Sequence, residues 1–371
     1  MLTSKNWLRS TAVAVLVLQS MAGTGHAQDA GAFDHAGLAR QALEGHIRPG
    51  YAALVASAQA LTNELANSCT QTSRDRRRAV DRAFDGLVSA WGRIEHVRFG
   101  PVTEDNRLER ILFWPDRRGL GARQIAATLR DRDVSVLDPA VLAGKRIALQ
   151  GIGALEVALF DAPPKDGEDR VYRCAYAKAI AANIANIAGA ILKEWTDPDQ
   201  YSRDWLNPGA GNPHYLKPAE TSLALATAFD NGLERVRDNW IGGPLGFGPQ
   251  KRRLPAVLGK SGRTLQFVQA ALEGLRNLFT AGGMQKAIVA TKHNNPGVNT
   301  RINARLVVQE IQTGLDEIRA LSRQGRPLDP VAMQGPLIAV GFPLKNARLQ
   351  AAALLTLTAN LSTGFNASDG D

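Results

Sequence analysis

Apolar residues recur every three or four positions over long stretches of the chain, which is the spacing of one face of an α-helix. Five sets follow this period: Leu43, Ile47, Leu54, Leu61 and Leu65; Val80, Phe84, Leu87, Trp91 and Ile94; Ile180, Ile184, Ile187 and Ile191; Leu265, Val268, Leu272, Leu275 and Leu278; Val298, Ile302, Leu306, Leu315, Ile318 and Leu321. The pattern predicts five helices, the first bent at Pro49 and the third ending at Trp195.

Capping signals mark several expected helix starts. Asp138-Pro139, Asn295-Pro296 and Asp329-Pro330 each place a side-chain acceptor before a proline, an arrangement typical of a first helical turn. Ser261 is expected to cap the helix predicted at 264–279. Strand signals are nearly absent, because no stretch keeps an alternation of period two and no hairpin dipeptide separates apolar runs. We therefore predict an all-α fold.

The segment 197–218 lacks helical period and is rich in Pro, Gly, Asn and Asp, so we interpret it as a linker. It divides the rest of the chain into 28–196 and 219–371, each with about four or five helices, which is enough for a helical bundle. Two other long irregular stretches, 99–118 and 241–261, have the length of functional loops. We expect two helical bundles joined by a central linker.

The N-terminus has the three parts of a secretory signal peptide. Lys5 and Arg9 are basic, residues 11–22 are apolar, and Gly25 and Ala27 are small. We expect residues 1–27 to be removed, with Gln28 beginning the mature chain. The alternative is an interfacial helix that stays attached. The apolar run is too short for a permanent transmembrane helix, and we expect no transmembrane segment after the signal is removed.

Two cysteines, Cys69 and Cys174, remain in the mature chain. Export brings them to an oxidising compartment, so we predict that they form a disulfide, with two free thiols as the alternative. Two cysteines are too few for a cysteine metal site.

The formal net charge is +9 and becomes +7 when Lys5 and Arg9 leave with the signal. A basic protein suggests nucleic-acid binding, but export and the lack of a run of five basic residues argue against a nucleic-acid partner. The densest basic patch comprises Arg74, Arg76, Arg77 and Arg78. We interpret it as a solvated helix face, with an acidic surface or an anionic ligand as the alternative partner.

Several catalytic motifs are missing from the sequence. The mature chain has five histidines, and no two are spaced by three or four residues as a helical metal site requires. Gly259-Lys260-Ser261 resembles the end of a phosphate loop, but Leu254 occupies the position of the first glycine. No Gly-x-Ser-x-Gly elbow occurs. A histidine-rich metal site is therefore not expected, although carboxylates can still bind a hard cation.

The predicted helix at 148–160 is apolar on almost every side, yet Glu156 shares a face with Ile152 and Leu159. A carboxylate there has to be paired, protonated or open to water. Gly151 and Gly153 precede it, and two glycines in one turn indicate that something packs close to both. Glu156 is either part of a buried ion pair or part of a functional site.

The same stretch resembles the imelysin-like family, whose mark is Gly-x-His-x-x-Glu on a buried helix. Here it runs from Gly151 to Glu156, with Gly153 at the histidine position. Further stretches resemble a subgroup of that family: Trp91-Gly92-Arg93-Ile94-Glu95-His96, Arg98-Phe99-Gly100-Pro101, Glu104-Asp105-Asn106-Arg107, Phe113-Trp114-Pro115-Asp116, Arg173-Cys174-Ala175-Tyr176, and the C-terminal residues from Gly364 to Asp371. The resemblance covers about 35–371.

The resemblance implies two helical bundles, a periplasmic or outer-membrane-associated location and a link to iron-regulated uptake. Some members are metallopeptidases. Because Gly153 replaces the histidine, we expect a non-enzymatic binding or accessory component of iron or metal uptake. A metallopeptidase and a structural partner of another envelope protein are the alternatives. We expect no cofactor, with iron or another divalent metal as the alternative ligand, and a small molecule or an envelope protein as the partner.

Glu156 needs a hydrogen-bond donor, and we expect it to be Arg93, Arg107 or Arg110. A cleft between its helix and the stretch 99–118 would form the site, with an aromatic wall. The predicted ligand-binding residues are Glu156, Gly151, Gly153, Trp91, Arg93, Asn106, Arg110, Trp114 and Asp116.

Overall fold

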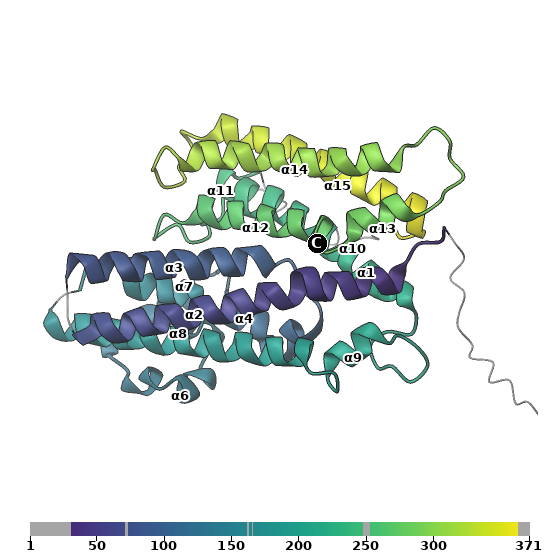
Figure 1. Ribbon diagram of the computed structural model, residues 1–371. Helices are drawn as coiled ribbons and strands as arrows, with labels where there is room; N and C mark the ends of the chain where they lie inside the picture. Colours follow the sequence, from purple (N-terminus) through teal and green to yellow (C-terminus); the bar gives the residue numbers. More distant parts are fainter. Residues whose placement is uncertain (1–30, 71–72, 162, 165, 248–252, 363–371) are drawn as a thin grey trace, which may run out of the picture. The chain divides into compact units, whose positions relative to one another are not determined.

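Three long helices of the first half lie side by side in the computed structural model, which describes residues 31–70, 73–161, 163–164, 166–247 and 253–362 (Figure 1). They are α2 (Arg48–Thr70), α3 (Arg74–Ile94) and α8 (Gly167–Thr196), and α2 packs against both of the others. All five apolar residues that define the period in α3 are at most 4% exposed. The expected signal peptide and the C-terminal motif lie outside the described residues.

Shorter elements precede and link these helices. The chain enters through α1 (His35–Ala42) and a π-helical turn, η1 (Leu43–Ile47), just before the bend expected at Pro49. Between α3 and α8 lie η2 (Gly100–Asn106), α4 (Arg107–Ile111), α5 (Leu120–Asp131), η3 (Val134–Leu137), α6 (Pro139–Ala143), η4 (Ile147–Leu149), α7 (Ile152–Glu156) and η5 (Val157–Asp161). Asp138 caps α6 as predicted, because its side chain accepts a hydrogen bond from the backbone N–H of Ala140.

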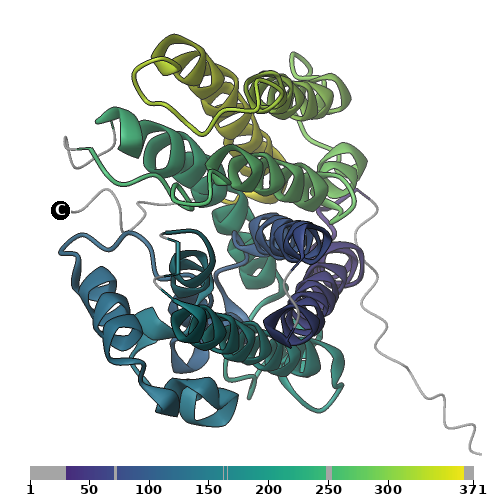
Figure 2. The same ribbon diagram turned by 90° about the vertical axis from the view of Figure 1, so that its left-hand side faces the viewer.

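The second half contains α10 (Pro218–Glu234), η6 (Arg235–Ile241), α11 (Gly242–Leu245), α12 (Thr264–Phe279), α13 (Met284–Ala290), α14 (Thr300–Ser322) and α15 (Gln334–Ala359). Helix α14 packs on α12 and α15, and α15 packs on α10. Helix α12 also packs on α3 (Figures 1 and 2). That approach is close, since a Cβ at Gly274 would lie 2.1 Å from the carbonyl oxygen of Arg93.

The segment 197–218 is more structured than its composition indicated. It contains α9 (Tyr201–Leu206), in which Trp205 is fully buried, and Tyr215 is only 7% exposed. The segment interpreted as a linker therefore contains a short helix that its composition did not indicate. Contacts between Cα atoms place Gly31–Asp371 in a single unit. The boundary between two bundles at 197–218 stays a prediction.

Three helix starts also differ from the prediction. Helix α15 begins at Gln334 after Met333, whereas Asp329 accepts hydrogen bonds from Val331 and Ala332 in the preceding turn. Helix α14 begins at Thr300 with Asn299 as its cap, whereas Asn295 accepts a hydrogen bond from Gly297 in the preceding turn. The residue before α12 is Arg263, not Ser261. The three errors have the same cause, because a Ser, Asn or Asp side chain can bond to a nearby turn or to a distant group as well as to a helix end.

The predicted disulfide is present. Cys69 at the end of α2 is bonded to Cys174 near the start of α8, with the two Cα atoms 5.5 Å apart. No strand occurs in the described residues, and the all-α prediction is confirmed. Helix α8 has the length and composition of a membrane-spanning helix, and 56% of its apolar window is buried inside the protein.

Candidate functional site

Helix α7 is positioned by a glycine at its N-terminus. A Cβ at Gly151 would lie 2.6 Å from the carbonyl oxygen of Ile111 in α4, so only glycine allows this approach of helix to backbone. The prediction that something packs close is correct for Gly151. It is wrong for Gly153, because a Cβ there would meet nothing within 4 Å. There is open space at the position one helical turn before Glu156.

Glu156 is 6% exposed and is held by a segment far away in the sequence. Its Oε1 accepts hydrogen bonds from the backbone N–H and the hydroxyl of Ser261, both at 2.7 Å. Burial raises the pKa of the Glu156 carboxyl, while the two bonds from Ser261 and the nearby Lys260 ammonium oppose that shift. The burial effect is larger, so the pKa is raised overall.

The loop 256–263 brings Ser261 to this position. Leu258 and Gly262 have φ angles of 52° and 74°, so the loop turns sharply on either side of Ser261. Lys260 forms an ion pair with Asp161 at the end of η5. These contacts attach the loop before α12 to the helix that carries Glu156.

Arg263 adds a second attachment. Its Nε donates to Asp85 of α3 at 2.9 Å, and its guanidinium lies 4.7 Å from the ring centroid of Phe160. A guanidinium over an aromatic face is a favourable cation–π arrangement. The loop 256–263 is therefore bonded to α3, α7 and η5.

The three arginines expected to pair with Glu156 bond elsewhere, and that prediction is wrong. Arg93 pairs with Glu273 at 2.8 Å. Arg107 pairs with Glu194 at 2.8 Å. Arg110 donates to the side chain of Gln150 at 2.9 Å.

The other predicted residues have structural contacts. Trp91 is buried in α3 at 2% exposure, and Asn106 has a left-handed backbone before α4. Asp116 accepts a hydrogen bond from the N–H of Ala122 in the first turn of α5. Trp114 donates to the carbonyl oxygen of Pro255 at 3.3 Å. The stretch 99–118 therefore reaches the start of the loop that carries Ser261. A binding role for these residues stays a prediction.

Sequence reasoning missed Ser261, Lys260 and Arg263 as partners of the Glu156 region. Gly259-Lys260-Ser261 resembles the end of a phosphate loop, but nothing local in the sequence connects it to a carboxylate 105 residues away.

A buried histidine pair was also missed. His46 of η1 and His96, just after α3, lie with their Nε2 atoms 2.9 Å apart, and both side chains are buried. Burial lowers the pKa of His46 to about 4, and burial, followed by repulsion from His46 and Arg235, lowers the pKa of His96 well below its ordinary value. The ring that accepts this hydrogen bond has to be neutral, and the lowered pKa values keep the donating ring neutral as well near pH 7. Spacing along one helix could not reveal this pair because two separate elements supply it.

The residues around Glu156 do not fit a catalytic metal ion. Such a site needs three protein ligands of the His, Asp, Glu or Cys type and an open position. Glu156 already accepts two hydrogen bonds, Asp161 is paired with Lys260, and the Lys260 ammonium would repel a cation. In the described part of the chain, no group of three or more such ligands comes together.

Comparisons with known proteins agree with this architecture. The family model described as Imelysin matches residues 47–362. An imelysin-like protein from Psychrobacter arcticum 273-4 has a similar structure, with a TM-score of 0.72, 19% identity, and coverage of 90% of this chain and 99% of that one. A protein from Parabacteroides distasonis ATCC 8503, provisionally described as an iron-regulated protein A precursor, gives a TM-score of 0.64 at 14% identity, covering 87% and 92%. A search of curated proteins finds no match. The chain belongs to the imelysin family.

Proposed function

We propose that the chain is exported to the periplasm and acts there as a non-enzymatic binding or accessory component of iron or metal uptake. Two observations on relatives support the link to iron. The chain belongs to the imelysin family, and one structural neighbour is described as an iron-regulated protein precursor. The three-part N-terminus supports export.

The contact between Glu156 and Ser261 carries the non-enzymatic part of the proposal. A metallopeptidase uses its metal to activate a water molecule, which requires several protein ligands around one open position. Gly153 provides no ligand, and Oε1 of Glu156 is engaged by two donors of Ser261. We infer that this chain comes from a subgroup in which the family histidine is replaced by glycine and the family glutamate, Glu156, has become part of a structural junction.

Iron uptake by the native host tests the proposal. Deleting the gene should lower the accumulation of radioactive iron under iron limitation. The full chain should restore it, whereas a chain lacking residues 2–27 should not, because it would stay in the cytoplasm. Periplasmic extracts should contain a chain that begins at Gln28.

A protease assay separates the proposal from the metallopeptidase alternative. Purified protein should leave casein intact with or without added zinc. Hydrolysis that a chelator abolishes, or normal iron uptake in the deletion strain, would contradict the proposal.

A further inference from the structure

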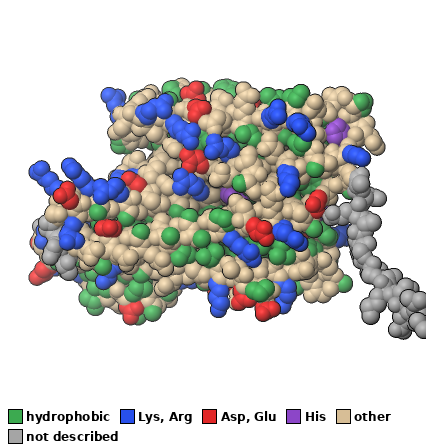
Figure 3. Space-filling view, in the orientation of Figure 1, with side chains coloured by type: hydrophobic (Ala, Val, Ile, Leu, Met, Phe, Trp, Pro, Cys, Tyr) green, Lys and Arg blue, Asp and Glu red, His purple; other side chains and the backbone are tan. Residues whose placement is uncertain are grey.

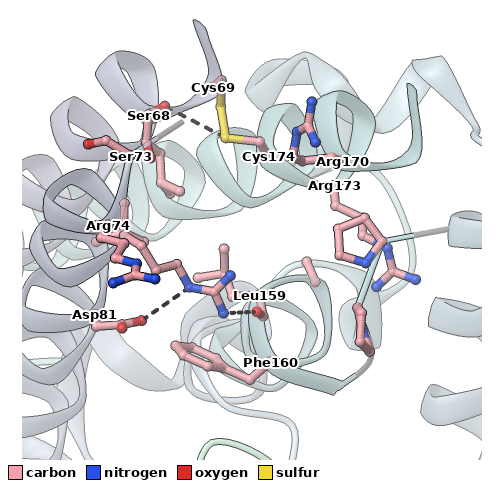
Figure 4. A pocket seen from close by; sticks show the side chains of 16 residues that line it. Ser68, Cys69, Ser73, Arg74, Asp81, Leu159, Phe160, Arg170, Arg173 and Cys174 are labelled. Atoms are coloured by element: carbon pink, nitrogen blue, oxygen red, sulfur yellow. Dashed lines mark hydrogen bonds and ion pairs between the residues drawn. A yellow bond between two sulfur atoms is a disulfide. The ribbon is translucent and has the colours of Figure 1, made fainter. Parts of the chain in front are cut away.

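A cavity of about 670 Å³ opens between the end of α2, the start of α3, η5 and the start of α8 (Figure 4). Its lining residues are Leu65, Ser68, Cys69, Ser73, Arg74, Arg77, Val80, Asp81, Ala158, Leu159, Phe160, Pro163, Pro164, Arg170, Arg173 and Cys174. The volume lies within the range of about 300–1,000 Å³ that small-molecule sites occupy. Glu156 is not among these residues, and the cavity does not depend on the proposed function.

The wall of the cavity is largely apolar. Leu159 and Phe160 of η5 and Val80 of α3 line it, and the Cys69–Cys174 disulfide borders it (Figure 4). Pro163 and Pro164 extend the same apolar wall. Hydrocarbon placed against such a wall gains about 0.8 kcal/mol per buried methylene, so the cavity favours an apolar chain or ring.

The charge around the cavity is positive. Arg74, Arg77, Arg170 and Arg173 line it, with Asp81 as the single carboxylate among its lining residues. The basic patch on α3 that the sequence indicated supplies two of these arginines, and Figure 3 shows Lys and Arg side chains gathered where α3 begins. This charge excludes a cationic ligand and favours an anion.

Two of the arginines, Arg77 and Arg173, have guanidinium N–H groups that can bind an anion. Arg77 is 64% exposed, its Nη2 donates to the carbonyl oxygen of Leu159 at 3.3 Å, and its Nε lies 3.8 Å from a carboxylate oxygen of Asp81. Arg173 is only 12% exposed and uses its Nε on Asp169. Its Nη1 is buried and has no hydrogen-bond partner among the described residues. A buried guanidinium nitrogen without an acceptor is uncommon.

We propose that this cavity binds an anionic amphiphile, an acyl chain that ends in a carboxylate or a phosphate. The head group accepts hydrogen bonds from the arginines, which suit the planar geometry of carboxylate and phosphate oxygens. The chain lies along the wall formed by Leu159, Phe160 and the two prolines. A small polar anion such as sulfate would leave this wall in contact with water.

Calorimetric titration of the purified chain tests the proposal, with every amphiphile kept below its critical micelle concentration. Dodecanoate and dodecyl phosphate are the two head-group probes. The probe that binds with the lower dissociation constant indicates whether the natural ligand ends in a carboxylate or in a phosphate. Dodecyltrimethylammonium should not bind. Decanoate should bind about fifteenfold more weakly than dodecanoate, because two methylenes at about fourfold each are lost.

Arg77→Gln is the informative variant and Arg78→Gln its matched control. The two residues are neighbours on α3 and both are exposed, but only Arg77 lines the cavity. Arg77→Gln should weaken dodecanoate binding about tenfold, the effect of losing one charge-assisted hydrogen bond. Arg78→Gln should leave it unchanged, and both variants should melt at the temperature of the parent chain.

Three results would each overturn the proposal: equal binding of dodecanoate by both variants, equal binding of the cationic amphiphile, or equal affinity for decanoate and dodecanoate. Attachment to vesicles of phosphatidylglycerol without binding of monomeric dodecanoate or dodecyl phosphate would also overturn it, since it would indicate a membrane surface as the partner.

Discussion

Glu156→Ala removes the carboxylate that accepts two hydrogen bonds from Ser261. The Ser261 N–H then loses its acceptor in a part-buried place, whereas the Ser261 hydroxyl can still donate to the carbonyl oxygen of Leu258, 3.1 Å away. Leaving a buried polar group unpaired costs about 1–3 kcal/mol, so we expect the free energy of unfolding to fall by about 1–3 kcal/mol for the unpaired N–H. Glu156→Gln keeps an acceptor oxygen for both donors and should stay within about 1 kcal/mol of the parent chain.

The pH dependence gives a second measure of the same contact. Burial raises the pKa of Glu156 above its ordinary value, so the unfolded chain releases this proton at a lower pH than the folded chain does. The group's contribution to stability is therefore fully present below the ordinary pKa and is lost as the pH rises through the raised pKa. Relative to Glu156→Gln, the parent chain should become less stable as the pH rises from the ordinary glutamate pKa through the raised pKa of Glu156.

Urea unfolding of the parent chain, the two Glu156 variants and Glu44→Ala measures these differences. Glu44 is an exposed carboxylate, and its removal should change stability by no more than about 0.5 kcal/mol. The reasoning is refuted if Glu156→Gln loses as much stability as Glu156→Ala and the parent chain gains stability over it with rising pH. Those results would show that attraction between the carboxylate charge and Lys260 holds the loop, not the bonds from Ser261.

Three further predictions concern separate features. The unfolded, unreduced chain should show no free thiol, and two labelled thiols per chain would contradict the disulfide. Replacing both Cys69 and Cys174 with serine should lower the free energy of unfolding by about 2–5 kcal/mol, as for other native disulfides. The histidine pair has lowered pKa values, so its contribution to the free energy of unfolding is present above the ordinary histidine pKa and should be lost as the pH falls through about 4. In denaturant titrations at several pH values, His46→Gln should lose less stability than the parent chain over this range. An equal loss in the two chains would count against a neutral buried pair. Gly153→His has room for its side chain and places a metal ligand one helical turn from Glu156. In calorimetry, the zinc affinity of this variant should exceed that of the parent chain by at least about tenfold. Equal affinities would show that Lys260 and Ser261 still prevent zinc binding.

The helices could be predicted where a long apolar period faces the core. Val80, Phe84 and Leu87 all point to the interior of the protein, and their spacing alone identifies α3. Helix α9 could not be found in this way because it spans only Tyr201–Leu206, too short for a period to repeat. The disulfide was predictable for a different reason, since two cysteines allow a single intramolecular pairing.

The location of Glu156 was predictable, but its partner was not. A carboxylate on an otherwise apolar helix had to be buried and had to find a donor. Which donor it finds depends on how α12 packs against α3, and that packing brings Ser261 to α7 from 105 residues away. Arg93, Arg107 and Arg110 were plausible donors by motif, yet each of them bonds to another side chain. Their acceptors are Glu273, Glu194 and Gln150.

Metal analysis of protein purified from the periplasm and dialysed against metal-free buffer tests most directly whether the family position has lost its metal. Iron and zinc should be present well below one equivalent per chain, in equal amounts in the parent chain and in Glu156→Ala. One equivalent of either metal in the parent chain, lost in a folded Glu156→Ala variant, would contradict the proposal that this position is a structural junction and not a metal site.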